Sequence, residues 1–131
     1  MALQVTDAAK SLALAYLVAN DVSVENLQLR LYSNDYTPSQ DSLSTDFTQV
    51  TQSNGYAAIN LIGSAWTVNG PTASYPTQTW SFTGSVGNVH GYYVITTTNN
   101  QVLFAERFPS APYNIANSGD IISVTLNLTS N

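Results

Sequence analysis

The chain has 131 residues, the size of one domain, a formal net charge of -5 and no cysteine. The missing cysteines exclude disulfides, thiolate nucleophiles and cysteine-based zinc sites. Only 8% of the residues are charged, and the three cations, Lys10, Arg30 and Arg107, are scattered. Phosphate backbones and anionic membranes attract clustered Lys and Arg, so we expect neither a nucleic acid nor a membrane as a partner.

Residues 1–20 are predicted to form an N-terminal helical segment, with one short helix over residues 6–19. Thr6 can cap its first turn, and Asp7 favours a helix N-terminus. The helix is apolar nearly all round, which indicates burial against two surfaces. Either it covers the open end of its own domain, or one of the surfaces belongs to another chain. Because Asp7 precedes the only lysine, the segment is a poor signal peptide, and we expect it to be retained on a protein made in the cytoplasm.

After Asn20 the hydrophobic period changes to two, which predicts a β domain over residues 21–131. Strands are predicted over residues 27–31, 47–50, 56–62, 66–68, 79–83, 91–98, 101–108 and 122–128. Turns are predicted at Asn54-Gly55, Asn99-Asn100 and Ser118-Gly119-Asp120, and a long exposed loop over residues 33–44. About eight short strands separated by turns predict a mostly β protein, an antiparallel β-sandwich of jelly-roll-like form preceded by the helix.

The predicted strand over residues 91–98 is apolar on both faces. Tyr93 and Ile95 share one face, and Tyr92 and Val94 share the other. Such a strand must be covered on both sides, here by another segment or by another subunit.

Glu106 is the most informative carboxylate. It has the same strand parity as Val102, Phe104 and Phe108, so an ideal strand would direct it toward the apolar side. A carboxylate there is costly unless it is paired. Either a bulge redirects Glu106 or a cation pairs with it, and we predict a structural or interface ion pair with Arg30.

Other groups that could carry chemistry are few. His90 is the only histidine, which excludes a pair of histidine metal ligands. Asp35, Asp41 and Asp46 lie in or beside the polar loop, where carboxylates are usually solvated; a glycosidase pair and a weak calcium site are the alternatives. We therefore predict a protein that is not an enzyme, with no cofactor and no metal.

Five stretches of sequence form a familiar series. They are LQLRLYSNDYTP (27–38), GYAAINL (55–61), SYPTQTWSF (74–82), GYYV (91–94) and LFAERF (103–108). Together they resemble a group of small structural proteins encoded in tailed-bacteriophage genomes, whose members carry a short N-terminal helical segment ahead of a β-sandwich. The resemblance implies a virion component made in the host bacterial cytoplasm: a capsid decoration, or cement, protein on the capsid exterior. It would sit as a homotrimer on the major capsid protein where capsomers meet.

For that function we expect the subunit or capsid interface to include Leu3, Val5, Leu12, Tyr16 and Tyr92. The alternative is a tail or fibre accessory protein, or a receptor-binding module, that recognises cell-surface carbohydrate. It would use the polar loop and a platform of aromatic side chains, for which the candidates are Trp66, Tyr75, Trp80, Tyr92 and Tyr93. The competing interpretation of these aromatic residues is that they form the core.

Overall fold

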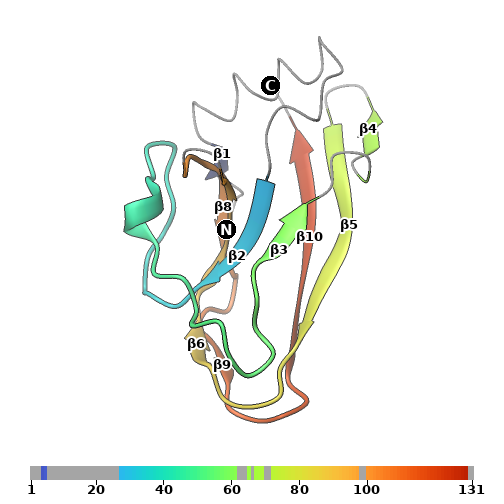
Figure 1. The fold of residues 1–131 in the computed structure, drawn as a ribbon. Helices are drawn as coiled ribbons and strands as arrows, with labels where there is room; N and C mark the ends of the chain where they lie inside the picture. Colours follow the sequence, from blue (N-terminus) through green and yellow to red (C-terminus); the bar gives the residue numbers. More distant parts are fainter. Residues whose placement is uncertain are drawn as a thin grey trace.

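The structure is a computed structural model that describes residues 4–5, 27–61, 65, 67–69, 72–97 and 100–129. The protein is mostly β, and its strands pair antiparallel, as the alternating sequence predicts (Figure 1). The strands are β1 (Gln4–Val5), β2 (Leu27–Tyr32), β3 (Ile59–Leu61), β4 (Thr67–Asn69), β5 (Thr72–Ser81), β6 (Gly87–Val89), β7 (Gly91–Thr96), β8 (Val102–Arg107), β9 (Tyr113–Ile115) and β10 (Ile121–Thr129). One short 3-10 helix, η1, spans Ser44–Asp46.

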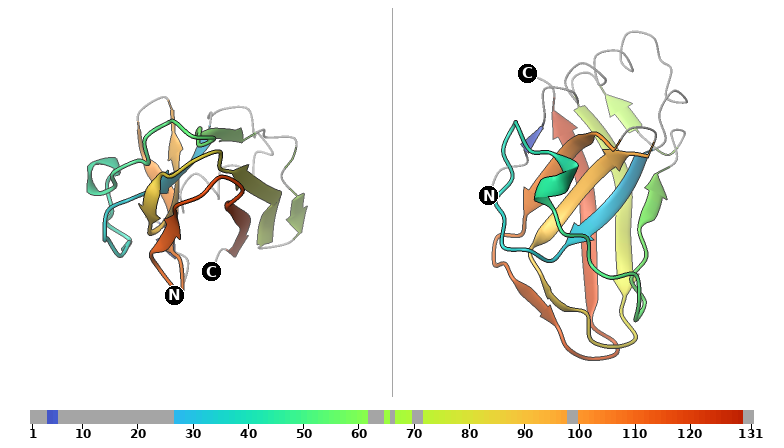
Figure 2. Two further views of the ribbon diagram at one scale, coloured as in Figure 1. Left: turned by 90° about the horizontal axis from the view of Figure 1, so that it is seen from below. Right: turned by 60° about the vertical axis from the view of Figure 1, so that its left-hand side comes forward.

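The described strands form three sheets. The order is β1-β8-β7-β2-β3 in the five-stranded sheet, β10-β5-β4 in the three-stranded sheet and β6-β9 in the third. The two larger sheets lie opposite one another (Figure 2). Leu29 and Leu31 of β2 belong to the same buried cluster as Val124 and Leu126 of β10, so one hydrophobic core joins the two sheets.

Several predicted elements are confirmed. β2, β7, β8 and β10 occupy the predicted positions within a few residues, and β7 and β8 form the predicted antiparallel hairpin. Asn54 and Gly55 adopt positive φ angles of 51° and 89°, as a tight turn requires. Gly119, in the turn before β10, has a φ of 98°. At these positions local sequence and tertiary structure agree.

Three predicted strands need correction. The strand predicted over residues 79–83 is β5, which begins much earlier, at Thr72, and ends at Ser81. The strand predicted over residues 47–50 is absent, since Gln49 forms only an isolated bridge with Tyr32. The strand predicted over residues 56–62 is reduced in the described chain to β3, which begins at Ile59. Tyr56 is buried before that strand, and its hydroxyl binds the backbone N–H of Leu31 at 3.1 Å. Its apolar character therefore reflects burial of a loop residue.

The helix predicted over residues 6–19 lies outside the described residues. Within the predicted N-terminal helical segment 1–20, the structure describes Gln4 and Val5, and these form β1 opposite Ala105 and Phe104 of β8. These two residues, which precede the predicted helix, therefore belong to the five-stranded sheet.

Candidate interaction surface

The outer face of the five-stranded sheet is crossed by residues 33–50, which we call the strap (Figure 2). Phe47 of the strap stacks on Tyr93 of β7, with ring centroids 4.5 Å apart and ring planes 11° apart. It also meets Tyr32 and Tyr36 edge-on, at centroid distances of 5.0 and 5.1 Å. Tyr32, Phe47 and Tyr93 belong to a second buried cluster. The second cover that β7 was expected to need is therefore a segment of the same chain.

Hydrogen bonds tie the two ends of the strap together. The side-chain amide of Asn34 donates to the carbonyl of Asp46 at 2.8 Å and accepts from the N–H of Thr48 at 2.8 Å. The N–H of Ser33 donates to the carbonyl of Thr48 at 2.8 Å. The Asn34 side chain thus makes the two kinds of backbone hydrogen bond that a neighbouring strand would make. These bonds fix the course of the strap, although its residues do not form a strand.

The middle of the strap is also fixed, and it presents one apolar side chain to solvent. The Tyr36 hydroxyl and the buried Ser42 hydroxyl are hydrogen-bonded at 2.7 Å, and Ser42 accepts from the N–H of Ser39 at 2.8 Å. Asp46 accepts from the N–H of Leu43 at 2.8 Å, beside η1. The Leu43 side chain is 64% exposed. It is therefore an exposed leucine on a backbone that is already ordered.

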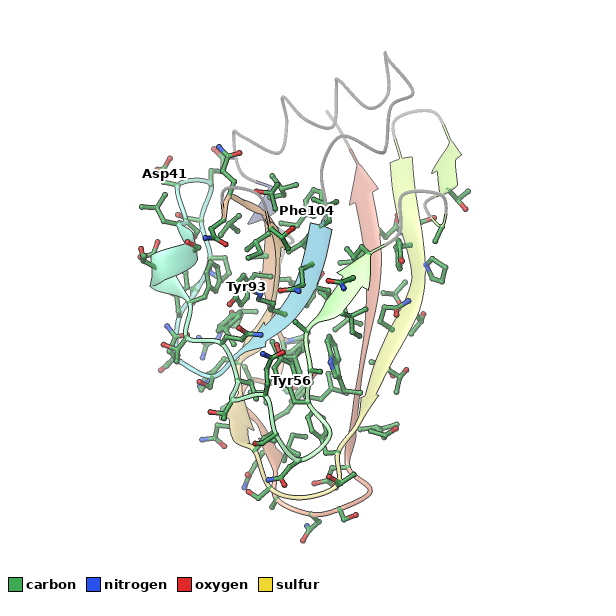
Figure 3. The ribbon with its side chains drawn as sticks, viewed as in Figure 1. Asp41, Tyr56, Tyr93 and Phe104 are labelled. Atoms are coloured by element: carbon green, nitrogen blue, oxygen red, sulfur yellow. The ribbon has the colours of Figure 1, made fainter. Side chains whose placement is uncertain are left out.

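An ion pair joins the strap to β8. Arg107 Nη1 lies 2.6 Å from Asp35 Oδ1, and the two side chains are 19% and 78% exposed. Solvent screens an exposed pair of this kind, so it contributes less than about 1 kcal/mol to stability. Arg107 has the same strand parity as Ala105 of the second buried cluster, so it faces away from the main core. Asp41 is exposed at the outer end of the strap (Figure 3).

The predicted ion pair between Arg30 and Glu106 is wrong, because the two residues lie on opposite faces of the sheet. Arg30 is opposite Tyr93 and shares its outer face, whereas Glu106 is opposite Tyr92 and faces the main core. The partner of Glu106 is the Tyr92 hydroxyl, which donates to its carboxylate at 2.8 Å. Arg30 Nε instead donates to the side-chain oxygen of Gln28 at 2.7 Å. A neutral donor inside the core thus takes the place of the expected cation.

The predicted interface residues have different outcomes. Tyr92 is 4% exposed and belongs to the main core of its own chain, so the assignment of this side chain to an interface is wrong. Val5 lies in β1, and only its backbone is described. Leu3, Leu12 and Tyr16 lie outside the described residues.

The predicted carbohydrate platform is not on the described surface. Tyr75, Trp80, Tyr92 and Tyr93 are all buried, and Trp66 lies outside the described residues. The Trp80 indole N–H is satisfied inside the protein, where it donates to the carbonyl of Ala57 at 2.8 Å. These four residues follow the core interpretation, because an aromatic platform for sugars must be open to solvent.

No group of three or more His, Cys, Asp or Glu side chains among the described residues is placed to hold a metal ion. His90 is buried between β6 and β7, and its Nδ1 has no hydrogen-bond partner within the described part of the chain. Its backbone is bonded on both sides, to the carbonyl of Tyr32 and the N–H of Phe108. His90 is therefore a packed residue between two strands. No described helix is long and apolar enough to cross a membrane.

The outer face of the three-stranded sheet carries hydroxyl groups. Thr77 and Thr125 are hydrogen-bonded across β5 and β10 at 2.6 Å, and Thr79 and Ser123 at 2.9 Å. All four side chains are exposed. Outward hydroxyls and inward aliphatic residues alternate along β10, which gives a two-sided strand with a neutral outer face.

Four buried tyrosines predict a fall in stability at alkaline pH. Burial raises the pKa of Tyr32, Tyr56, Tyr92 and Tyr93, and at Tyr92 the Glu106 carboxylate adds to the effect. A folded-state pKa above the unfolded value of about 10 gives stability that is present below pH 10 and lost as the pH rises. We expect the free energy of unfolding to fall above about pH 10, by up to ~1.4 kcal/mol per pH unit for each tyrosine.

Urea unfolding at pH 8, 10 and 11, with tyrosinate absorbance recorded in parallel, measures this fall. Tyr32→Phe should make it shallower, although it also removes the 2.9 Å bond from the Tyr32 hydroxyl to the carbonyl of Tyr36. A free energy of unfolding that stays constant up to pH 11 contradicts the prediction.

Comparison with known proteins found no matching family model, no similar curated protein and no similar solved structure.

Proposed function

We propose that this protein is a capsid decoration protein of a tailed bacteriophage: a non-enzymatic, jelly-roll-like β-sandwich that binds the major capsid protein on the outside of the head. The strap is the observation that carries the proposal. It is an ordered surface segment that the Phe47 ring holds on the sheet, its two ends are joined by Asn34, and it exposes Leu43.

A fixed strap suits binding to another protein because its shape is set before contact. Association has to pay for the ordering of mobile segments, and a segment that is ordered in advance avoids that cost. An exposed leucine on such a segment can then be buried against an apolar depression in a partner. With 8% charged residues, the recognition would rest on shape and apolar contact more than on ion pairs.

Such a protein strengthens a shell by mass action. If the strap contacts neighbouring capsomers together, it binds the assembled lattice better than free capsid subunits, and binding favours the closed shell. Many modest contacts repeated by the symmetry of the shell multiply this effect. No reactive group is required of the protein for this function.

The resemblance also implies a homotrimer, and we propose that the N-terminal segment supplies its contacts, through Leu3, Val5, Leu12 and Tyr16. Deletion of residues 1–19 tests this. It should lower the number of chains per assembly threefold in light scattering, because the three-fold contact is lost. An unchanged mass would remove these residues from the interface.

Leu43→Ser tests the strap as the capsid contact. Heads purified from a phage that lacks this gene are mixed with the protein and sedimented, and the bound fraction is measured. Burial of a leucine contributes about 1.5–3 kcal/mol, so we expect Leu43→Ser to bind about 10- to 100-fold more weakly, with unchanged stability.

The matched control is Ile121→Ser. Ile121 is the other exposed large apolar residue in the described chain, at 61%, and it lies in β10, away from the strap. We expect this variant to bind as the wild type does. Equal weakening by both variants would mean that Leu43 is not a specific contact, and wild-type protein that stays in the supernatant would contradict the proposed function itself.

A further inference from the structure

The edges of the two larger sheets are unequal. Among the described residues, the five-stranded sheet ends at β1 and β3, and the three-stranded sheet ends at β4 and β10. β1, β3 and β4 have two or three residues each, whereas β10 has nine. Within the described chain β10 pairs with β5 alone, so no described strand is hydrogen-bonded to its second edge.

The other long strand of that sheet is protected at its own outer edge. β4 covers the first residues of β5, and Pro76 follows, a residue that cannot donate to a neighbouring strand. Near the end of β5 the Trp80 indole N–H donates to the carbonyl of Ala57, and just beyond the strand the N–H of Thr83 donates to the carbonyl of Asn54. β10 lacks two of the usual protections, because it contains no proline and no charged residue.

We propose that β10 pairs antiparallel with β10 of a second copy of this chain, about a two-fold axis at Thr125. This inference goes beyond the proposed function and does not depend on it. Residues directly opposite one another in an antiparallel pair share a face, so the axis must pass through a single residue position. Thr125 is the middle residue of the nine, and pairing about it uses the whole strand.

In this register, each face of β10 brings residues of similar chemistry from the two copies opposite one another. Val124 is brought opposite Leu126 of the second copy, on the buried face, and Ser123 opposite Asn127, on the exposed face. The apolar core and the neutral hydroxyl face would therefore both continue across the axis. A two-fold contact of this kind uses both open edges at once, so it closes and does not grow into a fibre.

The backbone is directed correctly for such pairing. Phe82 donates its N–H to the carbonyl of Asp120 and accepts from the N–H of Gly119, so both of its backbone groups face the β10 side. By alternation along the paired strands, Ile122 and Val124 direct their backbone groups toward β5. The backbone groups of Ser123 and Thr125 therefore point to the open edge.

Charge also permits self-pairing at this edge. Two copies each carrying a net charge of -5 repel one another, but β10 itself is uncharged. The nearest carboxylate, Asp120, accepts from the N–H groups of Ala116 and Asn117 at 3.1 Å each. In the proposed register the two Asp120 residues lie ten residue steps apart, about 33 Å along the strands, several Debye lengths at physiological salt.

Light scattering on the full chain tests the contact. The pairing requires an even number of 14.1 kDa chains: two through β10 alone, or six when a three-fold contact is also present. Thr125→Lys places two ammonium groups opposite each other on the axis and should halve the mass. Thr79→Lys, on the same face but one strand inward, is the control and should leave it unchanged. A monomeric or trimeric wild type overturns the proposal.

A mixture of charge variants separates loss of pairing from loss of folding. Thr125→Lys mixed with Thr125→Asp should recover the wild-type mass, because the axis brings the two charges together. Variants that stay dissociated when mixed count against the register.

Cysteine substitution gives an independent test, because the chain has no cysteine of its own. Thr125→Cys should crosslink two chains on air oxidation, whereas Ser123→Cys, whose two copies would be about 13 Å apart, should not. Crosslinking of Ser123→Cys alone overturns the register.

Discussion

Gly91→Ala is expected to lower the free energy of unfolding by about 3 kcal/mol, the upper end of the usual cost of overpacking. Gly91 opens β7 between Tyr32 of β2 and Arg107 of β8. A Cβ atom there would collide with the backbone carbonyl oxygen of Glu106, and it would lie 2.6 Å from the Tyr32 hydroxyl oxygen. The Tyr32 ring cannot move aside freely, because it is fully buried and its hydroxyl bonds to the carbonyl of Tyr36.

Urea unfolding of the wild type and two glycine variants checks this result. Gly87→Ala is the control: Gly87 has a φ of 83°, but a Cβ atom there would meet nothing within 4 Å. Its cost comes from the backbone conformation alone, about 1 kcal/mol. If Gly91→Ala is no less stable than Gly87→Ala, the strands around Gly91 can separate, and the close approach of the Tyr32 ring is not a constraint on the fold.

The strands that the sequence predicted well are those whose two faces differ. In β2 and β10 apolar and polar residues alternate, and the apolar residues are the buried ones, so the strands lie where the alternation predicts them. The segment 47–50 failed for a physical reason. Phe47 and Val50 are both buried, but as anchors of a loop, and Phe47 is held by ring contacts. Apolar periodicity reports burial, and it does not distinguish a strand from an anchored loop.

Glu106 shows a second limit of strand parity. The prediction that it faces the apolar side is confirmed, because it lies opposite Tyr92. Val102, which was expected to share the face of Glu106, instead belongs to the second buried cluster. The reason is a register shift in the β7–β8 pairing, which places an extra residue, Leu103, before Phe104. A bulge of one residue reverses the parity beyond it, and no local signal in the sequence marks this one.

The partner of Glu106 was missed because the prediction looked for a cation. A buried carboxylate needs a donor, and a tyrosine hydroxyl directly opposite on the next strand can supply one. Once the β7–β8 hairpin is aligned, Tyr92 and Glu106 are direct neighbours. The predicted two-residue turn at Asn99-Asn100 would align Glu106 with Tyr93, so the observed pairing with Tyr92 does not follow from the sequence of the hairpin alone. The strap fastening by Asn34 likewise depends on long-range geometry that local patterns do not contain.

Phe47→Ala is expected to lower the free energy of unfolding by about 3–4 kcal/mol, the usual range for a buried phenylalanine. The substitution removes the ring that stacks on Tyr93 and packs against Tyr32, so the strap loses its main anchor on the sheet. We also expect faster cleavage of the strap by a protease that cuts before aspartate, at Asp35, Asp41 and Asp46.

Leu43→Ala is the matched control within the strap. Its side chain is mostly exposed, so its truncation should change stability by less than about 0.5 kcal/mol. The two variants distinguish the residue that holds the strap on the sheet, Phe47, from the residue proposed to contact the capsid, Leu43. If the strap binds phage heads as proposed, Phe47→Ala should weaken that binding with Leu43 still in place, because the strap must then be ordered at the moment of contact. Equal binding by Phe47→Ala and wild type would mean that the order of the strap serves the stability of the domain alone.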